Sequence, residues 1–129
     1  MPAEYRHVMA LGSADLDRIA GAREVSIETR SGDRRIRTVI WVVVDDGDVL
    51  VRSVRGEGGR WYRRAVADPE VSLLVGSDRY QFRAVSVADP DDIERASDAL
   101  RRKYPPGRSL DSMLRPEVLG TTLLLEPVI

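Results

Sequence analysis

The stretch from Trp41 to Tyr62 constrains the fold of this chain most strongly. It reads WVVVDDGDVLVRSVRGEGGRWY, with two apolar runs on either side of Asp46-Gly47, then a glycine-rich segment and an amphipathic run. An Asp-Gly pair between apolar runs is a strong signal for a tight β-hairpin. We therefore predict a strand, a turn, a strand, a loop and the start of a helix, around which the other elements pack.

The remaining apolar patterns predict a chain built mainly of short strands. Apolar runs separated by turn residues indicate six strands, at residues 24–29, 36–44, 48–54, 71–75, 80–87 and 121–125. Helical periodicity indicates helices at residues 13–20, 60–67 and 89–104, with a further helical turn at 109–115. This pattern favours a closed or nearly closed β-barrel, with the helix at 60–67 over one rim.

Length and composition narrow the class of protein. The 129 residues fit one domain, for which we predict the bounds 1–129, with residues 1–12 as a flexible tail. There is no cysteine, and His7 is the only histidine, which disfavours a disulfide framework, a zinc–thiolate site and a Ser-His-Asp triad. The chain shows neither a signal peptide nor a long apolar run, so we predict a cytoplasmic protein without a membrane partner.

The charge pattern points to a local anion site. The net charge of −1 argues against a general nucleic-acid binder. Residues 52–64 nevertheless hold five arginines and one glutamate, a local charge of +4, and residues 30–37 hold four arginines and one aspartate, +3. The first cluster allows two interpretations: a cofactor phosphate site, or a solvated edge paired with the acidic helix at 89–98. A coding bias toward arginine could also explain both clusters.

The phosphate interpretation rests on three features of one segment. Gly56, Gly58 and Gly59 would let a ligand approach the backbone, and the helix that follows presents free N–H groups and a partial positive charge. Arginines add paired donors that fit phosphate. The segment is not a P-loop, because no Gly-Lys-Ser/Thr follows, and it lacks the third glycine and the βαβ unit of a dinucleotide fingerprint.

In order and spacing, five short elements resemble a known group of proteins. These elements are Thr29-Arg30-Ser31-Gly32, Arg37-Thr38 with Trp41, DGDVLVRS, GGRWYRRAVADPEVSLLV and Lys103-Tyr104. They are similar to the flavin- and deazaflavin (coenzyme F-420)-binding split β-barrels, which include pyridoxamine phosphate oxidase-like and deazaflavin-dependent nitroreductase-like proteins. The resemblance covers residues 13 to 127 and is greatest to an uncharacterised branch of that superfamily.

The resemblance implies a fold, an assembly and a site. The implied fold is mainly β (α+β), a six-stranded split β-barrel with short peripheral helices. The implied assembly is a homodimer, with FMN or deazaflavin in a groove between the barrels. The residues implied near the phosphate are Arg52, Ser53, Gly58, Gly59, Arg60, Trp61 and Tyr62, and those implied near another part of the cofactor are Arg30, Ser31, Arg37 and Thr38.

Two function classes stay open at this stage. The first is an FMN- or deazaflavin-dependent oxidoreductase that transfers a hydride to a small molecule, in which the cofactor carries the chemistry. The second is a non-catalytic cofactor carrier, sensor or dimeric structural module without a cofactor. Ile40, where deazaflavin-dependent relatives carry proline, and Arg63-Arg64, where they carry asparagine, favour the second slightly. Nucleic-acid binding would need more aromatics among the arginines than Trp61 and Tyr62, so we predict no such partner.

Overall fold

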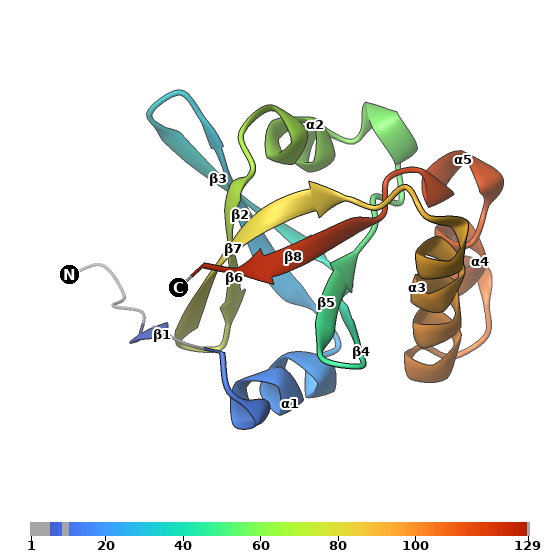
Figure 1. Ribbon diagram of the computed structural model, residues 1–129. Helices are drawn as coiled ribbons and strands as arrows, with labels where there is room; N and C mark the ends of the chain where they lie inside the picture. The colour runs from blue at the N-terminus through green and yellow to red at the C-terminus, as the bar shows by residue number, and fades with distance from the viewer. Residues whose placement is uncertain (1–5, 9–10, 129) are drawn as a thin grey trace.

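One curled antiparallel sheet forms the body of the protein. The computed structural model describes residues 6–8 and 11–128, and seven of its strands follow the order β3-β2-β6-β7-β8-β5-β4 (Figure 1). Their bounds are Val25–Ser31 (β2), Arg34–Ile40 (β3), Val43–Asp45 (β4), Asp48–Val51 (β5), Glu70–Val75 (β6), Asp78–Ser86 (β7) and Leu123–Pro127 (β8). The sheet curls into a half-barrel, which confirms the predicted split-barrel class.

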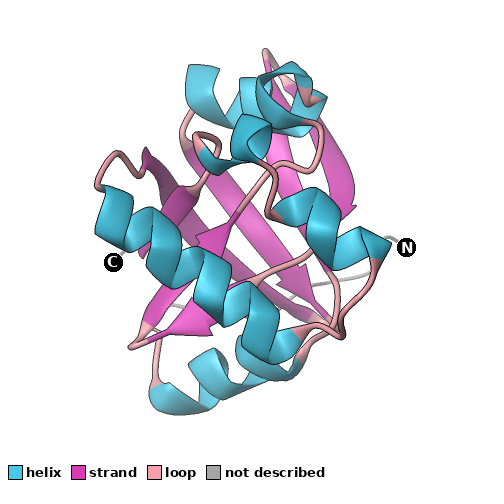
Figure 2. Cartoon of the chain, turned by 90° about the vertical axis from the view of Figure 1, so that its right-hand side faces the viewer, coloured by secondary structure: helices cyan, strands magenta, loops and turns pink. Residues whose placement is uncertain are grey.

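In the described residues, five α-helices and one 3-10 turn surround the sheet. They are α1 (Ser13–Gly21), η1 (Gly56–Gly58), α2 (Arg60–Ala67), α3 (Pro90–Lys103), α4 (Arg108–Met113) and α5 (Pro116–Leu119). Helix α2 lies over one end of the sheet in Figure 1, as predicted for a helix over the rim. Helix α3 runs across the strands in Figure 2. Its N-cap is Asp89, whose side chain accepts a hydrogen bond from the backbone N–H of Asp91.

The N-terminal stretch is described only in part. Arg6–Val8 forms β1, which pairs in parallel with residues 78–80 of β7. Residues 1–5 and 9–10 of the tail predicted at 1–12 lie outside the described part of the chain. Helix α1 begins at Ser13, the first residue of the helix predicted at 13–20, and its N-cap is Gly12. The backbone N–H of Gly12 donates to the Asp15 carboxylate at 3.1 Å, so Asp15 stabilises the N-terminus of the helix.

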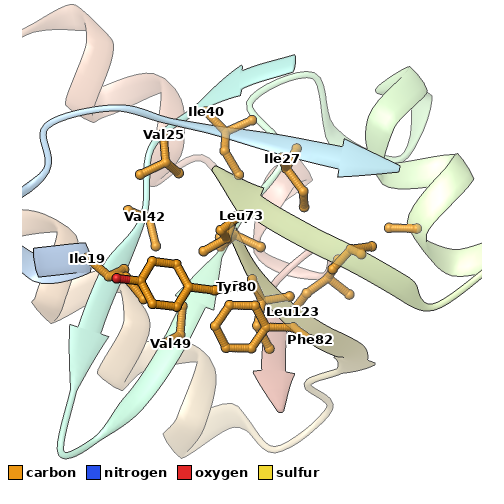
Figure 3. Packing of buried hydrophobic residues seen from close by; sticks show 14 of the residues in the cluster. Ile19, Val25, Ile27, Ile40, Val42, Val49, Leu73, Tyr80, Phe82 and Leu123 are labelled. Atoms are coloured by element: carbon orange, nitrogen blue, oxygen red, sulfur yellow. The ribbon is translucent and has the colours of Figure 1, made fainter. Parts of the chain in front are cut away.

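Two hydrophobic cores lie on opposite faces of the β4-β5 hairpin. The larger fills the half-barrel, where Ile27, Leu73 and Phe82 are fully buried (Figure 3). The smaller lies between the other face of the hairpin and helices α3 and α4, with Leu50 against Leu100. Successive strand residues point to opposite faces, so this hairpin is covered on both sides. Its continuous apolar sequence agrees with that double coverage.

The expected long strand at residues 36–44 is divided in two. The pairing of β3 with β2 ends at Ile40, opposite Val25. The pairing of β4 with β5 begins at Val43, opposite Leu50. Trp41 and Val42 therefore connect the two edges of the sheet, β3 and β4, by covalent linkage instead of a hydrogen-bonded ladder. This division and β1 raise the number of strands above the six expected. The turn after β4 has positive φ at Asp46 (50°) and Gly47 (82°), which confirms the predicted tight hairpin.

Side chains from the end of α3 satisfy the backbone where the ladder breaks. The Tyr104 hydroxyl accepts from the Val42 N–H at 3.2 Å and lies 2.8 Å from the carbonyl oxygen of Arg23, to which it donates. The Lys103 ammonium donates to the Val42 carbonyl at 2.6 Å. Unpaired buried backbone groups are costly, so these two side chains stabilise the junction. The Lys-Tyr pair noted in the sequence is thus explained by the connection between β3 and β4.

Lys103 should make stability depend on pH in a definable window. Burial lowers the pKa of its ammonium from 10.5 to about 8. Between these values the unfolded chain binds more protons at this site than the folded chain, so stability rises as pH increases through the window. We expect the free energy of unfolding of the wild type, relative to Lys103→Met, to increase from pH 7.5 to pH 9.5. Urea titrations at both pH values measure it, and a constant difference would contradict burial of this amine.

Candidate functional site

A wide groove of about 1060 Å³ opens on the inner face of β3. Its walls come from β3 and Trp41, from the segment after β5, from the start of α2 and from α4. The residues at its walls are Glu24, Arg34, Ile36, Thr38, Val39, Ile40, Trp41, Arg52, Ser53, Val54, Arg55, Gly59, Arg60, Trp61, Arg64, Ser109, Ser112 and Met113. Segments far apart in the sequence therefore form one concave surface, the form that small-molecule sites take.

The groove carries an excess of positive charge. It is lined by Arg34, Arg55, Arg60 and Arg64, together with the buried Arg52, against the single acid Glu24. Within residues 11–128, the guanidinium groups of Arg34, Arg55 and Arg60 make no ion pair or hydrogen bond. Arg64 donates from Nε to the Thr29 hydroxyl at 2.8 Å. Arginines that the protein does not neutralise itself are available to an anionic ligand.

Helix α2 begins at this groove. Gly59 is its N-cap, so no side chain caps the helix. The first backbone hydrogen bond of the helix joins the Arg63 N–H to the Gly59 carbonyl at 3.0 Å. The N–H groups of the preceding first turn have no acceptor within the helix, and the helix dipole adds partial positive charge there. Arg60 is exposed at this end, whereas Trp61 is buried in the core and also lines the groove. The combination suits a phosphate.

The glycines before α2 have different structural requirements. Gly56 has φ of +67°, and an added Cβ would lie 3.2 Å from the Glu117 carbonyl. At Gly59 an added Cβ would lie only 2.3 Å from Ser53 Oγ, although φ is an ordinary −63°. At Gly58 a Cβ would meet nothing within 4 Å. The close approach at Gly59 is therefore made by the protein's own Ser53, which donates to the Gly56 carbonyl at 2.9 Å.

Arg52 lies beneath the groove and is 3% exposed. Its donors reach Thr122 Oγ1 at 2.9 Å, Ser97 Oγ at 2.9 Å, and the carbonyls of Met113 and Ile93, both at 3.0 Å. Burial lowers its pKa to about 10. Four of its five N–H groups thus hold α3, the end of α4 and the segment before β8. We assign Arg52 a positioning role, since at most one donor is left for a ligand.

Three of the residues suggested by the resemblance lie away from the groove. Arg37 donates from Nε to Glu28 at 3.0 Å on the opposite face of the sheet, where Arg79 also binds this carboxylate, at 2.7 Å. Burial opposes ionisation of Glu28, but the hydrogen bonds from Arg79 and Arg37 outweigh it, so the Glu28 pKa is lowered. Arg30 binds Asp68 at 3.0 Å, and Ser31 is exposed beside the β2-β3 turn.

Of the remaining residues suggested by the resemblance, some line the groove and others do not. Thr38 lines the groove, because it lies on the face of β3 opposite to Arg37. Gly58 and Tyr62 are not part of the groove wall. The Tyr62 ring packs edge-to-face on Trp61, with 6.3 Å between ring centroids, and against the larger core. The structure thus brings together Thr38, Arg52, Ser53, Gly59, Arg60 and Trp61 at one groove.

Several groove residues were not selected from the sequence. Arg55 and Arg64 belong to the arginine cluster that was recognised, and the helical spacing of Arg60 and Arg64 does predict a shared face. Arg34 alternates with Ile36 and Thr38 along β3, which was an available signal. Nothing local marks the polar residues from other segments, which are Glu24, Ser109 and Ser112.

Trp41 lies between the smaller core and the groove. In the structure its ring stacks on Tyr104, with centroids 3.8 Å apart and planes 4° from parallel. Tyr104 is buried, while Trp41 is half-buried and lines the groove. Trp41 therefore joins the smaller core to the groove wall.

The described part of the chain contains neither a cluster of metal ligands nor a membrane-spanning helix. No group of three or more histidine, cysteine, aspartate or glutamate side chains in it could hold a metal ion. None of the helices it contains is long and apolar enough to cross a membrane.

Solved structures share this architecture across nearly the whole chain. A FAD-binding protein from Mycobacterium smegmatis matches with a TM-score of 0.64 and 17% identity, covering 92% of each chain. The heme storage protein HutZ from Vibrio cholerae matches with a TM-score of 0.67 and 14% identity, over 94% of this chain and 92% of that one. A conserved hypothetical protein from Mycobacterium tuberculosis matches with a TM-score of 0.67 and 18% identity, over 97% and 84%.

The fold defines the class: this is a split-barrel protein, as the sequence resemblance predicted. Residues 15–125 match the family described as "Uncharacterized protein conserved in bacteria (DUF2255)", and the chain belongs to that family. No curated protein matches the chain. At these low identities the solved structures show the fold alone.

Proposed function

We propose that this chain binds a flavin-type cofactor, FMN or deazaflavin, in the groove and uses it as an oxidoreductase that transfers a hydride to a small molecule. One observation carries the proposal. The start of α2 and three arginines without ion pairs among the described residues meet in a groove of about 1060 Å³ that also contains two tryptophans. Anion-binding groups at one place and aromatic walls beside them match a ligand with a phosphate and a planar ring.

Each group of residues has a distinct part in this proposal. Arg60 and the first N–H groups of α2 would hold the cofactor phosphate, and Arg55 would add charge beside them. Ser53 fixes the start of α2 through Gly56 and Gly59, and Arg52 fixes α3 and α4 behind it. The cofactor supplies the hydride chemistry when bound. The protein's own residues bind it, orient it and exclude water from its ring.

A second copy of the chain would complete the groove. Val39 and Val54 both line it, and they are 62% and 44% exposed. Exposed apolar side chains on the wall of a groove fit burial by a partner. The proposal therefore includes a homodimer with its groove closed by the partner.

The proposal is tested by titrating the purified protein with FMN and with deazaflavin, followed by visible absorbance and fluorescence. Saturable binding of one supports it, and no binding of either by a folded protein rejects it. Arg60→Ala should weaken binding about tenfold, the effect of losing roughly 1.4 kcal/mol from a charge-assisted contact. Arg63→Ala is the matched control, since Arg63 lies on the same helix, is exposed and does not line the groove. Equal losses in both variants would contradict the placement.

A non-catalytic carrier or sensor remains the second candidate. Glu24 is the only acidic side chain among the described groove residues, and none of these residues is lysine, histidine, cysteine or tyrosine. Few groups on this wall could therefore exchange a proton with a substrate. Tight binding of a cofactor that no reductant or acceptor turns over would favour this function over an oxidoreductase.

A further inference from the structure

The groove has an aromatic end and a cationic end. At the aromatic end, Trp41 lines the groove, and Tyr104 covers one face of the Trp41 ring in a parallel stack. Arg34 lies at the other end of β3, opposite Ser31 beside the hairpin turn. Arg64 is fixed toward this end by Thr29, which pairs with Ile36. Both arginines line the groove.

The length of β3 separates these two ends. Arg34 and Ile40 are the first and last residues of the strand. Six steps at about 3.3 Å per residue give a span of roughly 20 Å. An arginine side chain reaching back along the strand shortens this span, but leaves it longer than the single ribityl chain between the ring and the phosphate of FMN. A mononucleotide with its ring at Trp41 would therefore leave Arg34 without an anion.

We propose that the groove takes an elongated ligand with two anionic groups in series: a planar ring on Trp41, a first phosphate at the start of α2, and a second anionic group at Arg34 and Arg64. This inference rests on the proposed function and specifies its ligand. The chemistry corresponds to a dinucleotide such as FAD, or to a deazaflavin with an acidic tail, in preference to FMN. The positive charges spread along the full groove are what a second anionic group requires.

Arg34→Ala tests the second anionic position, and Arg35→Ala is its matched control. The two residues are adjacent and exposed, but Arg35 points to the opposite face, where it lies 3.7 Å from Glu28. The probes form two pairs that differ in length: FMN with FAD, and nicotinamide mononucleotide with nicotinamide adenine dinucleotide; deazaflavin coenzyme is a fifth probe. We expect Arg34→Ala to weaken an elongated probe about tenfold and a mononucleotide less than twofold. Arg35→Ala should change neither.

The position of the ring has its own readout. In a Trp61→Phe variant, Trp41 is the only tryptophan. Stacking of a planar ring on Trp41 should quench its fluorescence in parallel with binding. Saturable binding without quenching would overturn the ring placement, and the same quenching in Trp41→Phe, which keeps only Trp61, would also do so.

The outcomes separate this inference from the proposed function. If a flavin-type probe binds but Arg34→Ala has no effect, or weakens FMN and FAD equally, the elongated ligand is rejected and the proposed function stands. If only the nicotinamide dinucleotide binds, with the expected sensitivity to Arg34→Ala, the elongated ligand stands and the flavin-type function is rejected. If none of the five probes binds to the folded protein, both are rejected.

Discussion

Replacing Arg52 with alanine is expected to destabilise the protein by about 3 kcal/mol or more, because it leaves several buried hydrogen-bond acceptors unsatisfied. The carbonyls of Met113 and Ile93 and the hydroxyls of Ser97 and Thr122 all lose their donor in this variant. These acceptors belong to three separate segments, so their relative positions are expected to loosen together. Urea unfolding followed by circular dichroism measures the change.

Arg55→Ala is the control for this variant. Arg55 is exposed and makes no ion pair among the described residues, so its loss should change stability by less than about 0.5 kcal/mol. A loss of cofactor binding without a loss of stability in Arg52→Ala would contradict the positioning role. An Arg52→Ala protein of normal stability that fails to bind cofactor would show that Arg52 contacts the ligand directly, as the family resemblance implied.

Gly59→Ala is expected to destabilise the protein by about 2 kcal/mol, in the range found for overpacked interiors. The new methyl group would lie 2.3 Å from Ser53 Oγ, and Ser53 is buried and bonded to Gly56. The backbone at Gly59 is in an ordinary extended conformation, so the cost is steric and not conformational. Gly58→Ala, one residue earlier, should be nearly neutral, since nothing lies within 4 Å of its added Cβ.

A double-mutant cycle separates this steric cost from other effects. On a Ser53→Ala background the nearest atoms to the new methyl are the Gly56 carbonyl at 3.3 Å and the Ser53 Cβ at 3.5 Å. Gly59→Ala should then cost much less than it does in the wild type. Unfolding free energies of the four proteins give the coupling. Equal costs on both backgrounds would show that Gly59 is needed for another reason, such as the approach of a ligand.

Local signals predicted the elements well wherever the residues that end them are nearby in sequence. Helix α2 has the predicted bounds, because Gly59 precedes it and Asp68-Pro69 follows it. The β4-β5 turn followed from Asp46-Gly47. The division of the strand at Trp41 and Val42 could not be predicted in this way. The residues that satisfy Val42 are 61 and 62 positions away, and the apolar pattern continues through the break.

The candidate site was predicted in part, for reasons of geometry. The arginine cluster and the start of α2 are visible as a local pattern, and they do meet at one groove. The adjacent residues Arg37 and Thr38 were taken together, yet they point to opposite faces of β3, and only Thr38 of the two lines the groove. For Arg52 the sequence gives charge but not burial. Its acceptors are neutral oxygens 41 to 70 positions away, which no charge pattern reveals.

The two faces of β3 carry different arginines, so an insertion or deletion in this strand would displace both sets. On one face Arg34 lines the groove, and on the other Arg35 and Arg37 bind Glu28. Removing a single residue from the β2-β3 turn or from β3 would shift the register by one position and exchange the two faces. Thr38 would then point away from the groove, and Glu28 would lose Arg35 and Arg37 as counterions while keeping Arg79. Substitutions at the exposed positions of β3 should therefore be far better tolerated than any insertion or deletion.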